Sequence, residues 1–145
     1  MNAAAPASGE RFSFVQRVRF ADLDALGHVN NVEFLRFVET ARIAYVRSLM
    51  PDYTPLLDQG FSFILAESQI SYRSPAFLDE DLRTTIHAAQ VRRSSVLVAF
   101  EMRVEGDGRL VAEGHNVVVG YDFSEARPRP LPDDLRARLT AQDVG

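Results

Sequence analysis

The segment from Asp22 to Asn31 brings two carboxylates, an imidazole and two side-chain amides close together in the chain. These polar residues are Asp22, Asp24, His28, Asn30 and Asn31. A carboxylate can attack a carbonyl carbon or activate a water molecule, and the free N–H groups at a helix start can polarise that carbonyl. The segment therefore predicts chemistry at a carbonyl group. The alternative is an ordinary turn and helix cap, for which the same residue types are also suited.

The elements on either side of this segment determine how it would be positioned. Residues 11–20 alternate between apolar and polar, which is typical of a strand. Apolar residues then recur at helical spacing over residues 31–50, and Pro51 prevents this helix from continuing. A helix this apolar is usually covered by other elements on several sides. Asn30 or Asn31 is suited to cap its N-terminus.

Four further stretches are typical of strands and are bounded by turn residues. They span residues 61–72, 81–91, 95–104 and 110–123. Gly106 and Gly108 between the last two predict a hairpin. We expect residues 127–132 to be irregular and residues 133–140 to form a short terminal helix. One curved antiparallel sheet wrapped around one long apolar helix buries both elements most simply, which predicts an α+β fold.

The composition excludes several classes of catalyst. The chain has no Cys and no Lys, so a thiol nucleophile, a thiolate metal site, a Schiff-base lysine and the lysine of a P-loop are excluded. The G-x-S-x-G motif of α/β-type serine hydrolases is also missing. A net charge of −4 argues against a general nucleic-acid-binding protein, although it leaves room for a local arginine cluster.

The 145 residues suit one domain with one core. We expect this domain to span residues 11–140, after a disordered lead-in over residues 1–10 and before a C-terminal tail over residues 141–145. No apolar run approaches the ~20 residues that span a bilayer. The N-terminus lacks the basic start and apolar stretch of a secretory signal. We therefore expect a cytoplasmic protein that does not bind membranes.

Several motifs follow one another in a characteristic order. They are Val18-Arg19-Phe20-Ala21-Asp22-Leu23-Asp24, Gly27-His28-Val29-Asn30-Asn31, Phe34, and Glu39-Thr40-Ala41-Arg42. Residues 67–76, 114–122 and 130–136 continue the pattern more weakly. In this order the motifs resemble the hotdog-fold acyl-CoA thioesterase family that includes 4-hydroxybenzoyl-CoA thioesterase. The resemblance covers about residues 14–139 and implies hydrolysis of an acyl-CoA thioester to a free acid and CoA.

The resemblance also implies roles for the residues of the segment. Asp24 would be the catalytic carboxylate, as a nucleophile that forms a mixed anhydride or as a general base for water. The backbone N–H of Asn31 would polarise the thioester carbonyl. His28 is the natural alternative base near neutral pH, and we expect it to orient the loop or line the pocket. Asn30 would hold the loop or cap the helix.

Residues that bind substrate are expected on the helix, on the loop and on turns of the sheet. They are Asp22, Phe34, Glu39, Arg73, Arg92, Arg93, Ser94 and Ser95. Asp22 would mainly support the loop through hydrogen bonds, with the reactive role as its alternative. The arginines and serines would receive the phosphates of CoA, or else form a solvated turn. Glu39 lies three positions from both Arg36 and Arg42, so a salt bridge is the alternative to substrate contact.

We expect no cofactor, and no metal because His87 and His115 lack partners at metal-ligand spacing. A single curved sheet leaves strand edges uncovered, and the resemblance implies a homodimer or a homotetramer of paired dimers. Two other functions stay open, a hotdog 3-hydroxyacyl-thioester dehydratase or hydratase and a non-catalytic acyl-CoA-binding module. Release of a free thiol separates hydrolysis from dehydration.

Overall fold

The computed structural model describes residues 10–51 and 61–142. In chain order the elements are β1 (Phe12–Arg17), the 3-10 helix η1 (Phe20–Asp22), α1 (Asn31–Leu49), β2 (Ser62–Tyr72), β3 (Asp81–Val91), β4 (Ser95–Val104), β5 (Leu110–Asp122), β6 (Arg127–Pro128) and α2 (Asp133–Gln142). The predicted lead-in, a loop that the sequence predicts over residues 51–60 and the predicted C-terminal tail lie largely outside these residues.

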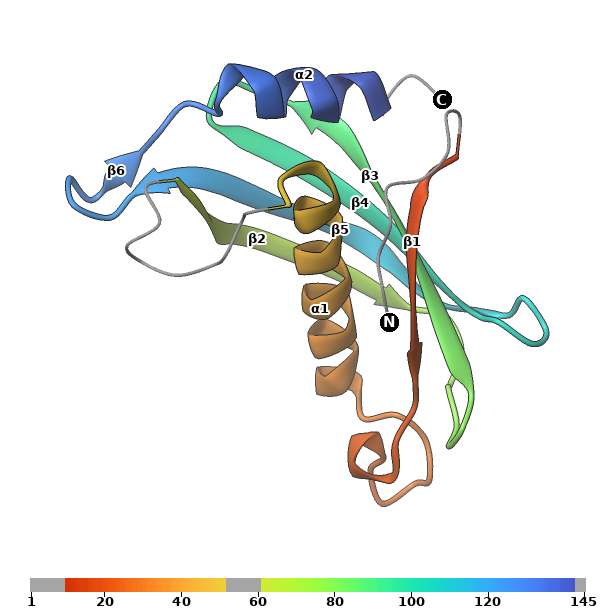
Figure 1. The fold of residues 1–145 in the computed structure, drawn as a ribbon. Coiled ribbons are helices and arrows are strands. Elements are labelled where there is room, and N and C mark those ends of the chain that lie inside the picture. Colours follow the sequence, from red (N-terminus) through yellow and green to blue (C-terminus); the bar gives the residue numbers. More distant parts are fainter. Residues whose placement is uncertain (1–9, 52–60, 143–145) are drawn as a thin grey trace.

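One antiparallel sheet forms the body of the molecule. Its strand order is β1-β3-β4-β5-β2, and the short β6 pairs with β5 beside this path. Figure 1 shows the sheet curving around α1, which lies against one face, while α2 crosses one end and packs against β3. The predicted α+β fold, with a curved sheet around one long helix, is confirmed.

The core lies between α1 and the facing side of the sheet. Strand β4 illustrates the pattern, since every second side chain is buried: Val96, Val98, Phe100, Met102 and Val104. The helix contributes Phe34, Phe37, Val38, Ala41, Tyr45, Val46 and Leu49. Full burial of a large apolar side chain contributes about 1.5–3 kcal/mol, so this contact fixes the helix, and with it the loop at the helix start.

The helix begins and ends close to the predicted positions. Asn30 caps α1, and the cap residue at its other end, Met50, is followed by Pro51. The expected cover on several sides is wrong, however, because Val32 is 59% exposed and Leu35 is 43% exposed. The sheet covers one side of the helix, and apolar surface remains on the other.

Two segments differ from their predictions. The predicted strand over residues 11–20 ends at Arg17, and the chain then turns into η1, where Leu23 N–H donates to Phe20 O at 3.2 Å. Phe20 is therefore 81% exposed instead of lying on the inner face. In the segment 127–132, predicted to be irregular, β6 pairs with the end of β5.

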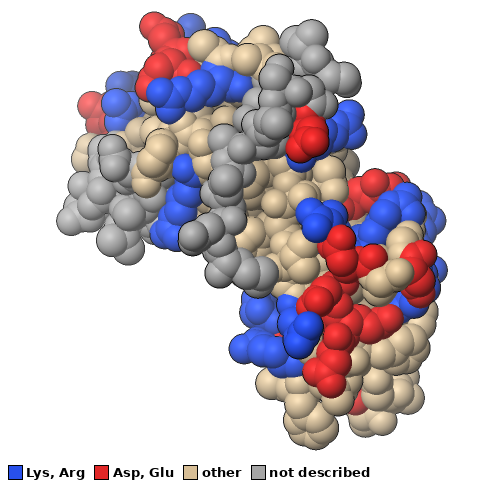
Figure 2. Space-filling view, turned by 45° about the vertical axis from the view of Figure 1, so that its right-hand side comes forward, with Lys and Arg blue, Asp and Glu red and all other residues tan. Residues whose placement is uncertain are grey.

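The surface carries charges of both signs. On the face drawn in Figure 2, acidic side chains gather over the lower part of the molecule, with arginines beside them and across the upper part. In the two described ranges, no helix is long and apolar enough to cross a membrane.

Candidate active site

A tight loop connects η1 to α1 and carries the polar residues of the segment. Asp24 N–H donates to His28 O at 3.0 Å, and Gly27 N–H donates to Asp24 O at 3.1 Å. Gly27 has a φ of 85°, a left-handed conformation that favours glycine. Leu23 and Val29 form an antiparallel bridge that closes the loop. We call residues 23–30 the catalytic-candidate loop.

Asp24 presents a partly exposed carboxylate on this loop. Its Oδ1 accepts a hydrogen bond from Leu26 N–H at 2.8 Å, which fixes the side chain. Its Oδ2 lies 3.6 Å from His28 Nδ1, and the Asp24 side chain is 26% exposed. A separation of 3.6 Å is longer than a hydrogen bond. Among the described residues, therefore, Oδ2 has no hydrogen-bond donor, and it is open to a substrate or a water molecule.

The start of α1 lies directly after this loop. Asn30 Oδ1 accepts from Val32 N–H at 3.2 Å, and Asn30 O accepts from Glu33 N–H at 2.8 Å. No acceptor in the described part of the chain is hydrogen-bonded to the N–H of Asn31. The positive end of the helix dipole makes this N–H a stronger hydrogen-bond donor, so the Asn31 amide can polarise a carbonyl group by donating to its oxygen.

Asp22 holds the loop against the helix. Its side chain is 1% exposed and accepts from Arg36 Nη2 at 2.6 Å and from Arg19 N–H at 2.8 Å. Burial alone raises the pKa of this carboxyl, but hydrogen bonds from Arg19 and the charge of Arg36 outweigh it and leave the pKa below its ordinary value. Asp22 O also accepts from Asn30 N–H at 2.9 Å. This placement suits a supporting role and leaves almost no surface for substrate contact.

The helix residues expected to bind substrate lie on different sides of α1. Phe34 is 4% exposed, and its ring packs edge-on against Tyr72 with centroids 5.6 Å apart. Tyr72 Oη also donates to Asn31 O at 3.1 Å, so this tyrosine, which sequence reasoning missed, ties β2 to the helix start. Glu39 is exposed and lines an apolar groove of about 330 Å³ between α1 and β2.

The alternative account of Glu39, a salt bridge with a flanking arginine, has no support in the structure. Arg36 contacts Asp22 and Glu33, and Arg42 Nη1 donates to Asn116 Oδ1 at 2.6 Å. Within the described residues Glu39 has no ion pair, and both Glu39 and Arg42 line the groove.

A second groove, of about 380 Å³, lies where the β3–β4 turn meets the β5–β6 hairpin. It is lined by Arg93, Ser94, Asp122, Arg127, Pro128, Arg129 and Pro130. We call this the basic groove, because three arginines line it and guanidinium groups suit phosphates. Asp122 also lines it, and Arg127 forms an ion pair with Glu125. Sequence reasoning missed Arg127 and Arg129, since long-range contacts bring their segment beside Arg93, namely the β5–β6 pairing and the hydrogen bond from Leu131 N–H to Arg93 O at 3.0 Å.

The other residues of the predicted CoA-binding set lie outside the basic groove. Arg92 donates to Gln90 Oε1 at 2.8 Å, and Ser95 begins β4. Arg73 pairs with Glu113 at 3.0 Å. The structure thus separates Arg73 from the β3–β4 turn with which it was grouped.

Arg73 lines a third cavity, of about 460 Å³, together with His87 and His115. His115 Nε2 lies 3.0 Å from Glu67 Oε1. In the part of the chain that the structure describes, no group of three or more His, Asp or Glu side chains could hold a metal ion.

Comparisons with known proteins agree with one another. A family model described as the thioesterase-like superfamily matches residues 18–139. Acyl-CoA thioesterase YbgC of Haemophilus influenzae is 30% identical over 127 residues, which cover 87% of this chain and 92% of the relative. Long-chain acyl-CoA thioesterase FadM of Escherichia coli is 28% identical over 123 residues, which cover 85% of this chain and 92% of the relative.

A solved structure supports the same likeness. The crystal structure of a thioesterase complexed with coenzyme A and Zn from Thermus thermophilus has a TM-score of 0.77 and 33% identity, and the match covers 90% of this chain and 92% of that chain. The region matched by the family model begins at Val18, so it contains the catalytic-candidate loop, α1 and strands β2 to β5.

Proposed function

Because the chain belongs to the thioesterase-like superfamily, we propose that it hydrolyses acyl-CoA thioesters to a free acid and CoA. Relatives named as acyl-CoA thioesterases match most of its length. The likeness to a thioesterase crystallised with coenzyme A supports the same class of substrate. The predicted family and its hotdog fold are confirmed.

One observation carries the mechanism that we propose. Asp24 Oδ2 and the Asn31 N–H belong to one short loop and the helix start that follows it, and neither has a hydrogen-bond partner in the two described ranges. The thioester carbonyl oxygen accepts from the Asn31 amide, which draws electron density from the carbonyl carbon. Asp24 then attacks this carbon, releasing CoA thiolate and leaving an anhydride for water to cleave, or it removes a proton from an attacking water.

The supporting residues keep these two groups in position. Asn30 caps the helix by accepting from Val32 N–H, the second amide of α1. The first amide, that of Asn31, thereby stays available to a substrate. Asp22 joins the loop to α1 through Arg36. His28 lies beside Asp24 without a short hydrogen bond to it, which favours an orienting role over that of a base.

The nucleotide part of CoA would bind in the basic groove, where Arg93, Arg127 and Arg129 offer guanidinium groups to its phosphates. Figure 1 shows the catalytic-candidate loop at the N-terminal end of α1, at the bottom of the view, and β6 at the upper left edge of the molecule, away from the helix. A helix of 19 residues is about 28 Å long. This separation within one chain favours a site completed by two protomers, with CoA held by one and cleaved at the loop of the other.

A second copy also suits the uncovered side of the molecule. Strand β2 is an edge of the sheet, and Ala66 to Gln69 are exposed along it. Exposed apolar side chains lie on this strand and on α1, namely Leu65 on β2 and Val32 and Leu35 on the helix. Pairing of two β2 edges would extend the sheet and cover these side chains. A homodimer is thus the expected unit, and a tetramer of two dimers is compatible with it.

The experiment that tests this function is thiol release, measured with a chromogenic trap. Wild-type protein and Asp24→Asn are assayed on aromatic and aliphatic acyl-CoAs of several lengths. We expect turnover by the wild type and a loss of at least about a hundredfold in Asp24→Asn. Circular dichroism and thermal melting check that the variant is folded.

The same assay separates the other functions. A dehydratase or hydratase acting on 3-hydroxyacyl thioesters would change the acyl group without releasing thiol, and a binding module would retain acyl-CoA unchanged. Turnover by Asp24→Asn near the wild-type rate would rule out the carboxylate mechanism while leaving the activity itself intact.

A further inference from the structure

Residues 75–80, the larger part of the connection between β2 and β3, lie against the catalytic-candidate loop. Val29 N–H donates to Ala76 O at 2.8 Å, and His28 and Phe77 form an antiparallel bridge. Ala76 is 0% exposed and Val29 is 2% exposed, so the contact is closely packed. We call residues 75–80 the buttress segment, because the backbone of His28 and Val29 rests on it.

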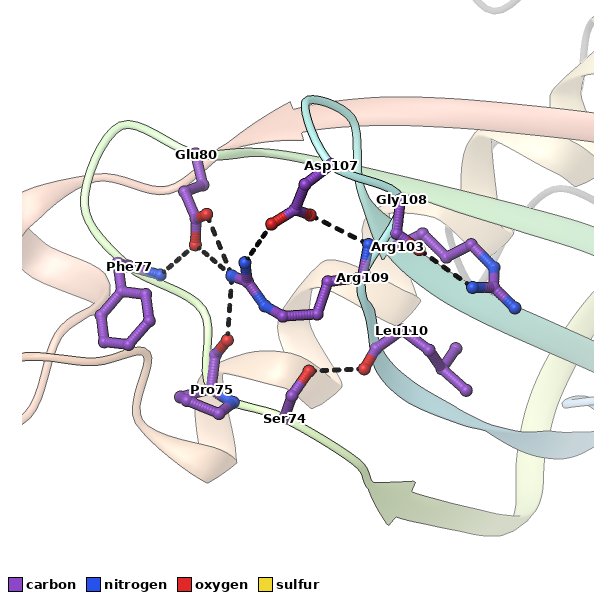
Figure 3. Close-up of polar contacts among 9 residues, drawn as sticks. All are labelled: Ser74, Pro75, Phe77, Glu80, Arg103, Asp107, Gly108, Arg109 and Leu110. Atoms are coloured by element: carbon purple, nitrogen blue, oxygen red, sulfur yellow. Dashed lines mark hydrogen bonds and ion pairs between the residues drawn. The ribbon is translucent and has the colours of Figure 1, made fainter.

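Arg109 forms hydrogen bonds to both ends of the buttress segment, at Pro75 and at Glu80. Arg109, next to the start of β5, donates from Nη2 to the two carboxylate oxygens of Glu80 at 2.7 and 2.9 Å, and to Pro75 O at 3.2 Å. Glu80 Oε1 also accepts from Phe77 N–H at 2.7 Å. Figure 3 shows the guanidinium between Glu80, Pro75 and Asp107, with Asp107 completing its contacts from the β4–β5 hairpin.

A series of hydrogen bonds leads from Arg109 to Asp24, the candidate catalytic residue. Arg109 holds Pro75 and Glu80, the segment between them pairs with His28 and Val29, and His28 O accepts from Asp24 N–H at 3.0 Å. A displacement of the buttress segment would therefore move the backbone that carries Asp24.

Stability alone does not explain this arrangement well. The side chains of Arg109 and Glu80 are 30% and 23% exposed, and ion pairs in contact with solvent typically contribute only about 0–1 kcal/mol. The Arg109 Nε is buried and, among the described residues, has no hydrogen-bond acceptor, which costs free energy. Nη2 contacts the Glu80 carboxylate and Pro75 O, while Nη1 contacts Asp107 on the hairpin. This two-nitrogen arrangement is better explained as a geometric constraint between the hairpin and the buttress segment, which the single ammonium of lysine could not reproduce.

We propose that Arg109 is a positioning residue for thioester hydrolysis, acting through Glu80 and the buttress segment on the loop that carries Asp24. The proposal rests on the proposed function for the role of Asp24. It assigns to the β4–β5 hairpin, which carries none of the candidate catalytic groups, a part in setting the rate of the chemical step.

The test compares Arg109→Gln with Arg103→Gln. Arg103 lies on the same hairpin and contacts Glu101 Oε1 at 2.7 Å and Gly108 O at 3.0 Å, but it has no hydrogen bond to the buttress segment. In the thiol-release assay, Arg109→Gln is expected to lower kcat by about tenfold or more with little change in KM, because small displacements of a reacting group slow the chemical step. Arg103→Gln should keep the wild-type kcat.

Two further variants show how Arg109 acts. Arg109→Lys retains the charge without the fork, so its kcat should lie between those of the wild type and Arg109→Gln. Combining Arg109→Gln with Glu80→Gln should cost little more than Arg109→Gln alone, because both changes break one connection. Equal losses in Arg109→Gln and Arg103→Gln, or a rise in KM alone, would overturn the proposal.

Amide hydrogen exchange gives a readout that does not depend on the reaction. The Val29 N–H should exchange faster in Arg109→Gln than in Arg103→Gln or the wild type, since its acceptor Ala76 O belongs to the buttress segment. If the wild-type protein releases no thiol from any acyl-CoA, the proposed function is refuted. Hydrogen exchange then still tests whether Arg109 is coupled to the Val29 backbone through the buttress segment. Unchanged Val29 exchange with an active wild type overturns only the role of Arg109.

Discussion

The Nδ1 of His28 lies 3.6 Å from Oδ2 of Asp24, beyond the length of a hydrogen bond. The same nitrogen is 3.4 Å from the carbonyl oxygen of Val29. The imidazole is thus shared loosely between a side chain and the backbone of its own loop. A general base oriented by a carboxylate would need a shorter contact, so the geometry favours Asp24 as the reactive group and His28 as a part of the loop.

This relationship predicts different outcomes for two substitutions. His28→Gln, which keeps a polar side chain of similar reach, should lower kcat by no more than about tenfold, whereas Asp24→Asn should lose at least about a hundredfold. Steady-state thiol release measures both. If His28→Gln were as inactive as Asp24→Asn while remaining folded, His28 would be the base and Asp24 its orienting partner.

The ion pair between Asp22 and Arg36 predicts a pH-dependent effect on stability. The pKa of Asp22 is held below its ordinary value of 3.8, so its contribution to folding is complete above that value and is lost as the pH falls through the lower folded pKa. Asp22→Asn should therefore lower the free energy of unfolding at pH 7 by about 2 kcal/mol, the typical contribution of a hydrogen bond to a charged group. Its difference from the wild type should shrink below about pH 4.

Urea denaturation at several pH values measures this difference. Asp81→Asn is the matched control, because Asp81 also pairs with an arginine, Arg17, but that pair is exposed to solvent. The control should change stability much less at every pH. A gap between wild type and Asp22→Asn that stays constant down to acid pH would contradict the account of Asp22.

The sequence predicted well what depends on local pattern. The bounds of β3 and β4 agree with prediction because alternation and flanking turns are properties of neighbouring residues. The helix cap was narrowed to Asn30 or Asn31 for the same reason, and Asn30 is the one that caps α1. Phe20 was assigned wrongly to a strand, because the alternation continues past the point where Asp22 turns the chain into η1.

Contacts between distant parts of the chain left no such signal. Arg109 and Glu80 meet only because β3, β4 and β5 are neighbours in the sheet. The same holds for Tyr72 against Asn31. Motif spacing thus predicted the candidate catalytic residues, while the contacts that hold them depend on strand pairing.

The basic groove predicts an effect that depends on the nucleotide part of the substrate. Arg93 has no side-chain partner among the described residues, so Arg93→Gln should disturb the fold little. Loss of one charge-assisted hydrogen bond to phosphate should raise KM for acyl-CoA by about tenfold, with kcat nearly unchanged. An acyl thioester of N-acetylcysteamine, which lacks phosphates, should show the same KM with both proteins. Equal effects on the two substrates would place the phosphates elsewhere.

A glycine in the middle of β5 predicts a large change in stability from one added methyl group. Gly114 faces β2 so closely that a Cβ there would overlap the carbonyl oxygen of Gln69, which is backbone and cannot move aside alone. Gly114→Ala should therefore separate β2 from β5 locally and lower the free energy of unfolding by about 2–3 kcal/mol. Thermal melting and urea denaturation measure the loss.

Gly106, in the β4–β5 turn, supplies the control for that substitution. A Cβ added at Gly106 meets no atom within 4 Å, so Gly106→Ala should leave stability unchanged or raise it slightly by restricting the unfolded chain. Because β2 is also the edge expected to pair with a second protomer, Gly114→Ala should weaken the dimer as well, which sedimentation at several protein concentrations would detect. A Gly114→Ala variant as stable as Gly106→Ala would mean that β2 and β5 can separate there at little cost, so that Gly114 does not fix their spacing.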